Sequence, residues 1–151
     1  MSNSHTTAQD LLAVVPLLTR IMAVELREEA GEDTTMPQFR VLSYLAEAPL
    51  TVSAIARKRR VSFQSAGELV QSLVTRGWIT RIPDPDDRRQ SLLHLSDEGR
   101  SHYSRAQQKM LARLVIYMDQ LDEAEQTTIQ SALQSLHRVL VQEVNEHDDH
   151  D

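Results

Sequence analysis

The sequence "WITRIPDPDDRRQSLLHLSDEGR", residues 78–100, places a dense charged stretch between two short apolar segments. Residues 78–82 and 91–95 are rich in β-branched, aromatic and leucine side chains, a composition typical of short strands. The eight residues between them contain Pro83 and Pro85, three aspartates and two adjacent arginines. This pattern predicts a β-hairpin with a long, stiffened and charged tip, which is commonly called a wing.

Two short helices are predicted directly before the hairpin. The first, residues 50–60, has Thr51 in a capping position. The second, residues 61–77, has Ser62 as its N-cap and Gly77 where a glycine commonly ends a helix. Two short helices separated by about three residues form a helix-turn-helix arrangement.

Longer helices are predicted on both sides of this region. Residues 7–30 and 100–145 repeat apolar side chains at spacings of three and four, and residues 36–49 form a shorter helix of the same kind. Pro16 predicts a late start or a kink in the first helix. Residues 146–151 form a polar tail. The fold class is therefore mainly α with a small β-hairpin wing.

The composition is that of one globular domain. The chain has 151 residues, of which 40% are hydrophobic and 25% are charged. The sequence contains no cysteine, which excludes disulfides, thiolate metal sites and cysteine nucleophiles. The N-terminus lacks a signal pattern, and no apolar run approaches the roughly 18 residues of a membrane helix. We therefore expect a cytoplasmic protein without a membrane partner.

The net charge of −6 conceals a basic region. Residues 57–89 contain eight basic and four acidic side chains, a local charge of +4, so the rest of the chain carries −10. A positive patch on an acidic body is the electrostatic pattern of a protein that binds nucleic acid.

The charged tip of the hairpin fits some kinds of site better than others. A calcium loop is excluded because Arg88 and Gln90 interrupt the oxygen ligands and no central glycine is present. A catalytic carboxylate pair would need a neighbouring nucleophile or base, and none is present. A solvated turn and a wing that contacts a charged partner both remain open.

The order of these elements resembles the multiple antibiotic resistance regulator (MarR) family of winged helix-turn-helix transcription factors. The most specific likeness is the wing signature of that family, Asp-x-Arg followed after five residues by Leu-Thr-x-x-Gly. The matching residues are Asp87, Arg89, Leu95, Ser96 and Gly99, with serine in place of threonine. The sequence "LVTRGWITR", residues 73–81, is also similar to the stretch that leaves the recognition helix in the family.

The resemblance implies a single MarR-like domain that forms a homodimer on a near-palindromic double-stranded DNA operator. The winged lobe would span residues 36–99, and residues 7–30 and 100–145 would be the dimerisation helices. Many members repress a gene and release DNA when a small aromatic or anionic effector binds. The sequence does not identify the effector or its residues, the operator, the regulated genes or the sign of regulation.

The wing would contact DNA through its arginines. Arg89 is expected to enter a narrow, A·T-rich minor groove, where the negative potential attracts a guanidinium group. Arg88 is expected to bind phosphate. The resemblance further suggests that Asp87 orients an arginine, with Arg81 on the adjacent strand as its partner.

The second helix of the helix-turn-helix is expected to enter the major groove by its N-terminal end. Gln64 could pair with adenine, Ser65 could contact a base or a phosphate, and Phe63 could touch a thymine methyl group. Glu68 stands where the family often has a basic residue, and it could accept from cytosine or merely repel phosphate. The candidates are Ser62, Phe63, Gln64, Ser65 and Glu68.

The preceding helix ends in four cationic side chains, Arg57, Lys58, Arg59 and Arg60. They could complement the helix dipole, or they could bind phosphates that flank the groove. Arg60 replaces the glycine usual in the family.

No cofactor, metal site or enzymatic activity is expected. Glu143 and His147 have a two-ligand spacing but no further ligands beside them. A hydrolase is disfavoured because no nucleophile elbow, metal motif or phosphate loop appears. Residues His102 with Arg105, or Arg40 with Tyr44, could line an effector cleft. The alternative function is a winged-helix module that binds protein without specific DNA binding.

Overall fold

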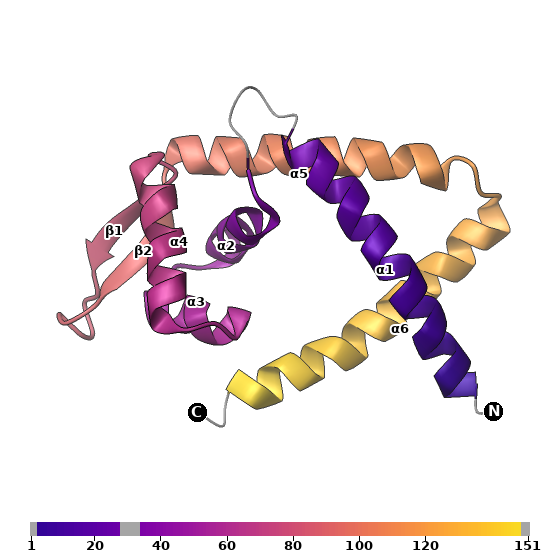
Figure 1. Ribbon diagram of the computed structural model, residues 1–151, viewed down its shortest axis with the longest axis horizontal. Coiled ribbons are helices and arrows are strands. Elements are labelled where there is room, and N and C mark those ends of the chain that lie inside the picture. The colour runs from indigo at the N-terminus through magenta and orange to yellow at the C-terminus, as the bar shows by residue number, and fades with distance from the viewer. Residues whose placement is uncertain (1–2, 28–33, 149–151) are drawn as a thin grey trace.

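The computed structural model describes residues 3–27 and 34–148, with the side chains beyond residue 142 excluded. Within these ranges six helices and one two-stranded hairpin follow each other along the chain (Figure 1). Their bounds are α1 Asn3–Arg27, α2 Met36–Glu47, α3 Val52–Arg59, α4 Phe63–Thr75, β1 Ile79–Pro83, β2 Ser91–Leu95, α5 Asp97–Met118 and α6 Glu123–Asp148. The predicted class, mainly α with a small hairpin, is confirmed.

The molecule consists of a compact lobe and three long helices that extend from it. Helices α2, α3 and α4 and the hairpin gather around the start of α5, and this unit is called the winged lobe below (Figure 1). Helix α1 packs against α5 beyond the lobe, and α6 folds back from the far end of α5. We call α1, α5 and α6 the outer helices.

Hydroxyl side chains cap α3, α4 and α5, and two of these caps, Thr51 and Ser62, are predicted from the sequence. The side-chain oxygens of Thr51, Ser62 and Ser96 each accept a hydrogen bond from the amide three residues later, at 2.9–3.1 Å. Asp122 and Glu125 form a reciprocal capping box, with bonds of 2.9 and 2.8 Å. These bonds satisfy amides that have no partner inside the helix.

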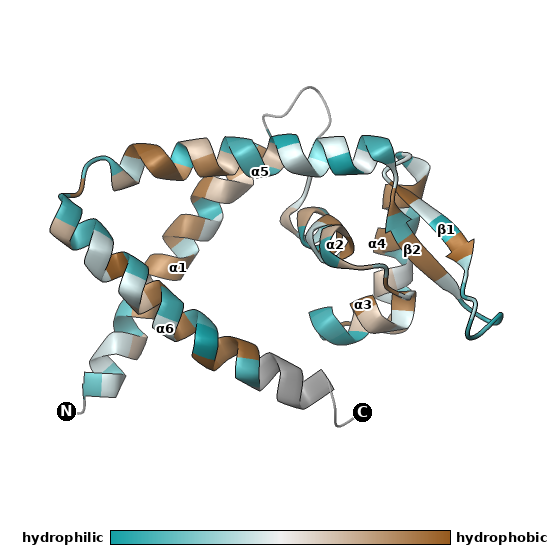
Figure 2. Cartoon of the chain, turned by 180° about the vertical axis from the view of Figure 1, so that it is seen from behind, coloured by the Kyte–Doolittle hydropathy of each residue, from teal (hydrophilic) through white to brown (hydrophobic). Residues whose placement is uncertain are grey.

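Apolar side chains from every element of the winged lobe meet in one core. Its largest fully buried members include Trp78, Leu42, Ile55, Leu73 and Leu93. The hydropathy colouring shows the same inward apolar faces on α2, α4 and β2 (Figure 2). Because α4 buries one face in this core, its opposite face is left to solvent.

The hairpin pairs its strands antiparallel from Ile79 opposite Leu95 to Pro83 opposite Ser91. Residues 84–90 form the turn, called the wing tip below. The sequence placed Trp78 in the first strand, but this residue is buried in the lobe core and the strand begins one residue later.

Helix α5 starts in direct contact with Trp78, the residue that precedes β1. A Cβ atom added to Gly99 would lie 1.9 Å from the carbonyl oxygen of Trp78, so only glycine fits there. The Trp78 oxygen also accepts from the Ser96 amide at 3.0 Å. One turn further along α5, the ring of His102 stacks on the Trp78 indole with centroids 3.8 Å apart, and its Nε2 lies 2.8 Å from Thr34 Oγ1. The hairpin and α5 are therefore joined through Trp78.

The outer helices expose much of their apolar surface in the single chain. Helix α1 begins at Asn3 and continues through Pro16. Of the two predicted effects of Pro16, a late start or a kink, the late start is therefore wrong. By length and composition α1 would suffice to cross a membrane, which contradicts the expectation that no segment would. A helix that packs against protein partners meets the same criterion, and α1 packs on α5. The predicted end of the first helix, at residue 30, lies outside the described residues.

Candidate nucleic-acid interface

The first turns of α4 are exposed while the rest of the helix anchors them. Ala66, Val70 and Leu73 are fully buried in the lobe core. All five candidate contact residues are exposed, and the Phe63 side chain keeps 64% of its accessible surface although it is apolar. The exposed N-terminal turns of a fixed helix are suited to contact base edges in a major groove.

Two of these candidates contact each other. Gln64 Nε2 donates a hydrogen bond of 3.4 Å to Glu68 Oε1, one helical turn further on. The sequence left open whether Glu68 repels phosphate or accepts from cytosine. The structure adds a third role, because Glu68 is the acceptor that holds the Gln64 amide.

The cations at the end of α3 lie beside the start of α4. Arg57, Lys58 and Arg60 are exposed, and Arg59 is half-buried. The Lys58 ammonium lies 5.8 Å from the centre of the Tyr44 ring, which positions it over α2. Since only two residues separate Arg60 from Phe63, these positive charges lie next to the exposed turns of α4.

Arg60 ends α3 in a left-handed backbone conformation. Its φ is 52° and its ψ is 47°, and its amide donates to the carbonyls of Ala56 and Arg57. An arginine there costs about 1 kcal/mol because Cβ approaches the backbone. Arginine stands here where the family that the sequence resembles usually has glycine. The turn keeps its left-handed conformation, and the arginine adds strain to it.

We expect the substitution Arg60→Gly to raise the free energy of unfolding by about 1 kcal/mol, since glycine adopts positive φ without strain. Urea unfolding followed by the fluorescence of Trp78, the one tryptophan, measures this change. The matched control is Arg59→Gly, where the helical conformation makes glycine destabilising by about 0.5–1 kcal/mol. Equal effects at the two positions would contradict the strain at Arg60.

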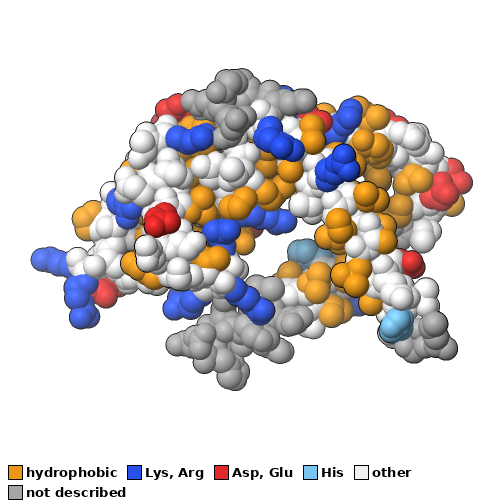
Figure 3. All heavy atoms as spheres, in the orientation of Figure 1, with side chains coloured by type: hydrophobic (Ala, Val, Ile, Leu, Met, Phe, Trp, Pro, Cys, Tyr) orange, Lys and Arg blue, Asp and Glu red, His pale blue; other side chains and the backbone are white. Residues whose placement is uncertain are grey.

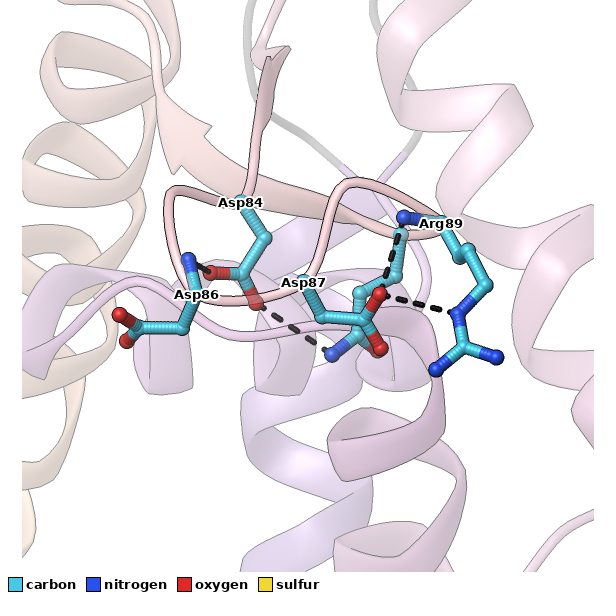
Figure 4. Close-up of polar contacts among 5 residues, drawn as sticks. Asp84, Asp86, Asp87 and Arg89 are labelled. Atoms are coloured by element: carbon cyan, nitrogen blue, oxygen red, sulfur yellow. Dashed lines mark hydrogen bonds and ion pairs between the residues drawn. The ribbon is translucent and has the colours of Figure 1, made fainter.

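The wing tip is organised around Asp84. This carboxylate is 8% exposed, and it accepts from the Asp86 amide at 2.9 Å and from Gln90 Nε2 at 3.3 Å (Figure 4). The Asp84 amide in turn donates to the carbonyl oxygen of Gln90 at 3.1 Å. Sequence reasoning gave Asp84 no structural role. The sequence pattern that could have indicated this role is Asp-Pro-Asp. An aspartate in a proline-containing turn often accepts a hydrogen bond from the backbone amide two residues later, which is an Asx turn.

Asp87 orients an arginine, but not the expected one. Asp87 Oδ1 accepts from the backbone amide of Arg89 at 3.0 Å and from its Nε at 3.3 Å (Figure 4). Arg81 instead donates from Nη2 to Gln71 Oε1 on α4 at 3.2 Å. The predicted pair of Asp87 with Arg81 is therefore wrong, because the Asp84 turn places Asp87 beside Arg89. Sequence reasoning also missed Gln71, which links α4 to the wing.

Arg89 projects from the wing tip with little to restrain its outer end. Its side chain is 93% exposed, and Arg88 beside it is exposed as well. Lysine and arginine side chains gather at the wing tip and along the adjacent edge of the winged lobe (Figure 3). The structure thus brings the predicted cations of α3 and the wing onto the lobe that also presents α4.

No metal centre accompanies this surface in the described part of the chain, where no three potential ligands among His, Asp and Glu come together. The side chains of Glu143 and His147 lie outside that part. His102, considered for an effector cleft, is buried against Trp78. A cavity of about 270 Å³ lies instead between α1 and α5, with Leu17, Arg20, Ile21, Val24, Glu25 and Arg113 around it.

Comparison with known proteins gives three consistent results. Residues 32–90 match the model of the MarR family. An HTH-type transcriptional regulator of Mycobacterium tuberculosis is 29% identical over 127 residues, which are 83% of this chain and 86% of that protein. The crystal structure of RV1404 from Mycobacterium tuberculosis has a TM-score of 0.82 at 26% identity, covering 92% of this chain and 95% of that one.

A further solved structure contains nucleic acid. FabT from Streptococcus pneumoniae, in complex with DNA, has a TM-score of 0.74 and 21% identity over 93% of this chain and 99% of that chain. The likeness to FabT concerns the fold, which is therefore one that a DNA-bound protein adopts.

Proposed function

We propose that the chain is a MarR-family transcriptional regulator. It is a cytoplasmic homodimer that represses transcription at a near-palindromic operator until a small effector releases it. The observation that carries the proposal is the combination, on one lobe, of the exposed turns of α4 with the cations of α3 and the wing.

Each part of this surface matches a feature of duplex DNA. The α4 turns supply hydrogen-bonding side chains for the major groove, whose base edges carry the sequence information. The cations of α3 and Arg88 supply the phosphate contacts that fix orientation. Arg89 extends from the wing tip with a 93% exposed side chain, and the negative potential of a narrow minor groove would attract its guanidinium group. A protein-interaction module would not require polar side chains on α4 with cations on both sides of it.

A gel shift with the DNA upstream of the gene tests the proposal. We expect a sequence-selective complex with a Kd on the order of 10 nM and an affinity that falls steeply as salt rises. The same length of shuffled DNA is the control. Equal affinity for both DNAs at every salt concentration would favour the alternative, a winged-helix protein-interaction module.

The outer helices support the homodimer. Large apolar side chains are exposed along all three of them, and exposed apolar patches of this kind commonly mark protein–protein interfaces. They include Leu12, Val15 and Leu17 on α1, Leu111 and Ile116 on α5, and Leu133, Val139 and Leu140 on α6. A second copy of the same helices would bury these faces around a two-fold axis.

We expect Leu133→Asp to convert the dimer to a monomer, because its 58% exposed side chain lies on the apolar stripe of α6 and would bury a charge in the interface. Sedimentation equilibrium at micromolar concentration measures the mass. The control is Ser131→Asp, which adds the same charge at an exposed position about 160° away around the helix. Trp78 fluorescence verifies that the winged lobe stays folded, and a Leu133→Asp dimer of unchanged affinity would place the interface elsewhere.

The effector part of the proposal is supported by the crossing of α1 and α5. The cavity between these helices combines apolar walls with the guanidinium groups of Arg20 and Arg113. Arg113 is engaged by Glu25 at 3.3 Å, while Arg20 is exposed. An apolar cavity with a cationic rim suits a small aromatic or anionic molecule.

A further inference from the structure

We propose that Glu68 is a positioning residue that makes Gln64 select adenine over guanine in the major groove. This inference rests on the proposed DNA-binding function and deepens it, because it assigns the base preference of one operator position. It starts from the hydrogen bond of 3.4 Å between Gln64 Nε2 and Glu68 Oε1 on the exposed face of α4.

The chemistry of the two groups fixes which way the Gln64 amide faces. An ionised carboxylate has acceptors only, whereas the glutamine side chain has an NH₂ donor at one end and a carbonyl acceptor at the other. The NH₂ end must therefore lie toward Glu68. Without this neighbour, the amide of an exposed glutamine can rotate and present either end.

The orientation leaves Gln64 with two free functions. One N–H bonds to Glu68, and the second N–H and the carbonyl oxygen remain available to a ligand. Adenine offers the complementary pair in the major groove, an N7 acceptor and an N6 donor. Guanine offers two acceptors, N7 and O6, so the Gln64 carbonyl would face the O6 oxygen without a hydrogen.

The charge of Glu68 acts in the same direction. A carboxylate one helical turn from Gln64 repels the O6 oxygen of guanine and the phosphates. It therefore weakens contacts in which an acceptor without a hydrogen faces this part of α4. The nearby Ser62 hydroxyl serves as the cap of α4 and accepts from the Ser65 amide at 3.1 Å. Glu68 is thus the group on the reading face of α4 that is placed to hold Gln64.

The test is a double-mutant cycle on operator variants. Each operator base pair is changed in turn to find the one at which Gln64→Ala removes a preference for A·T over G·C. At this base pair the Kd ratio of the G·C to the A·T operator is measured by fluorescence anisotropy for the wild type, Glu68→Ala, Gln64→Ala and the double variant.

We expect a wild-type ratio on the order of 10–100, the discrimination of one bidentate contact. Glu68→Ala should lower the ratio about tenfold, and Gln64→Ala should bring it close to 1. The double variant should equal Gln64→Ala, because Glu68 acts through Gln64. Glu68→Gln keeps an acceptor but can rotate, so its ratio should lie between those of the wild type and Glu68→Ala.

Three outcomes would overturn the inference. One is a Glu68→Ala ratio equal to that of the wild type. Another is a loss of discrimination by Glu68→Ala that persists in the Gln64→Ala background, which would mean that Glu68 contacts a base itself. The third is a Gln64→Ala variant that changes no base preference. Failure of the proposed function looks different, since the wild type would then bind no operator selectively.

The cycle also separates specificity from stability. Both side chains are exposed, so the urea midpoints of all four proteins should agree, as followed by Trp78 fluorescence. A changed base preference at equal stability is a result that a merely structural role for Glu68 does not produce.

Discussion

Gly99→Ala is expected to lower the free energy of unfolding by about 3 kcal/mol and the melting temperature by roughly 10 °C. The added Cβ would lie 1.9 Å from the Trp78 carbonyl oxygen and 2.7 Å from its carbon, both of which are backbone atoms. Relief requires α5 to move away from the hairpin by more than an ångström. That movement would break the Ser96 amide bond to Trp78 and disturb the stacking of His102.

The chain offers a matched control in Gly67. This glycine lies within α4, and a Cβ added there meets nothing within 4 Å. Gly67→Ala should therefore stabilise the protein by up to about 1 kcal/mol through its helix propensity. Calorimetry of the two variants should measure effects of opposite sign. A Gly99→Ala protein as stable as the wild type would show that α5 can move away from Trp78 at little cost in free energy.

Arg89→Ala is expected to weaken operator binding about 10- to 100-fold and to reduce the salt slope of log K by about one unit. The side chain is 93% exposed, so the free energy of unfolding and the dimer should be unchanged. The loss should be largest on operators with an A·T-rich segment beneath the wing, because a narrow minor groove concentrates the negative potential that arginine senses.

Arg88→Ala is the comparison that separates shape readout from phosphate binding. This neighbour is also exposed but lacks a hydrogen bond to Asp87 among the described contacts. It should reduce the salt slope similarly and weaken all DNA sequences to the same extent. If Arg89→Ala also weakened binding to all DNA sequences by the same factor, the assignment of Arg89 to the minor groove would be wrong.

Local sequence patterns were sufficient for the helix boundaries of the winged lobe. The hydroxyl caps at Thr51, Ser62 and Ser96 and the glycine at Gly77 act within one turn of their own position. Such features depend on the bond between a side chain and an amide three residues away, so the sequence contains nearly all the information. The hairpin could be predicted for the same reason, from two apolar runs around a charged turn.

Side-chain pairing in the wing depended on geometry that the sequence does not specify locally. The expected partner of Asp87 was Arg81 across the hairpin, whereas the turn around Asp84 places Asp87 next to Arg89. Arg81 is free to reach Gln71 because α4 lies against β1. The contacts of Asp87 with Arg89 and of Arg81 with Gln71 both follow from how the wing tip and α4 are arranged in three dimensions. A local residue pattern does not specify that arrangement.

The junction at Trp78 has a mechanical consequence for the proposed dimer. Because Gly99, Ser96 and His102 fasten the hairpin to the first turns of α5, the winged lobe must swing with that helix as a rigid arm. The 22 residues of α5 give an arm of about 33 Å. A tilt of about 5° at its far end would displace the lobe by roughly 3 Å, close to the rise of one base pair. Small movements among the outer helices would thus be amplified into a larger change in the distance between the two winged lobes of the dimer, and therefore between the DNA half-sites that they can bind.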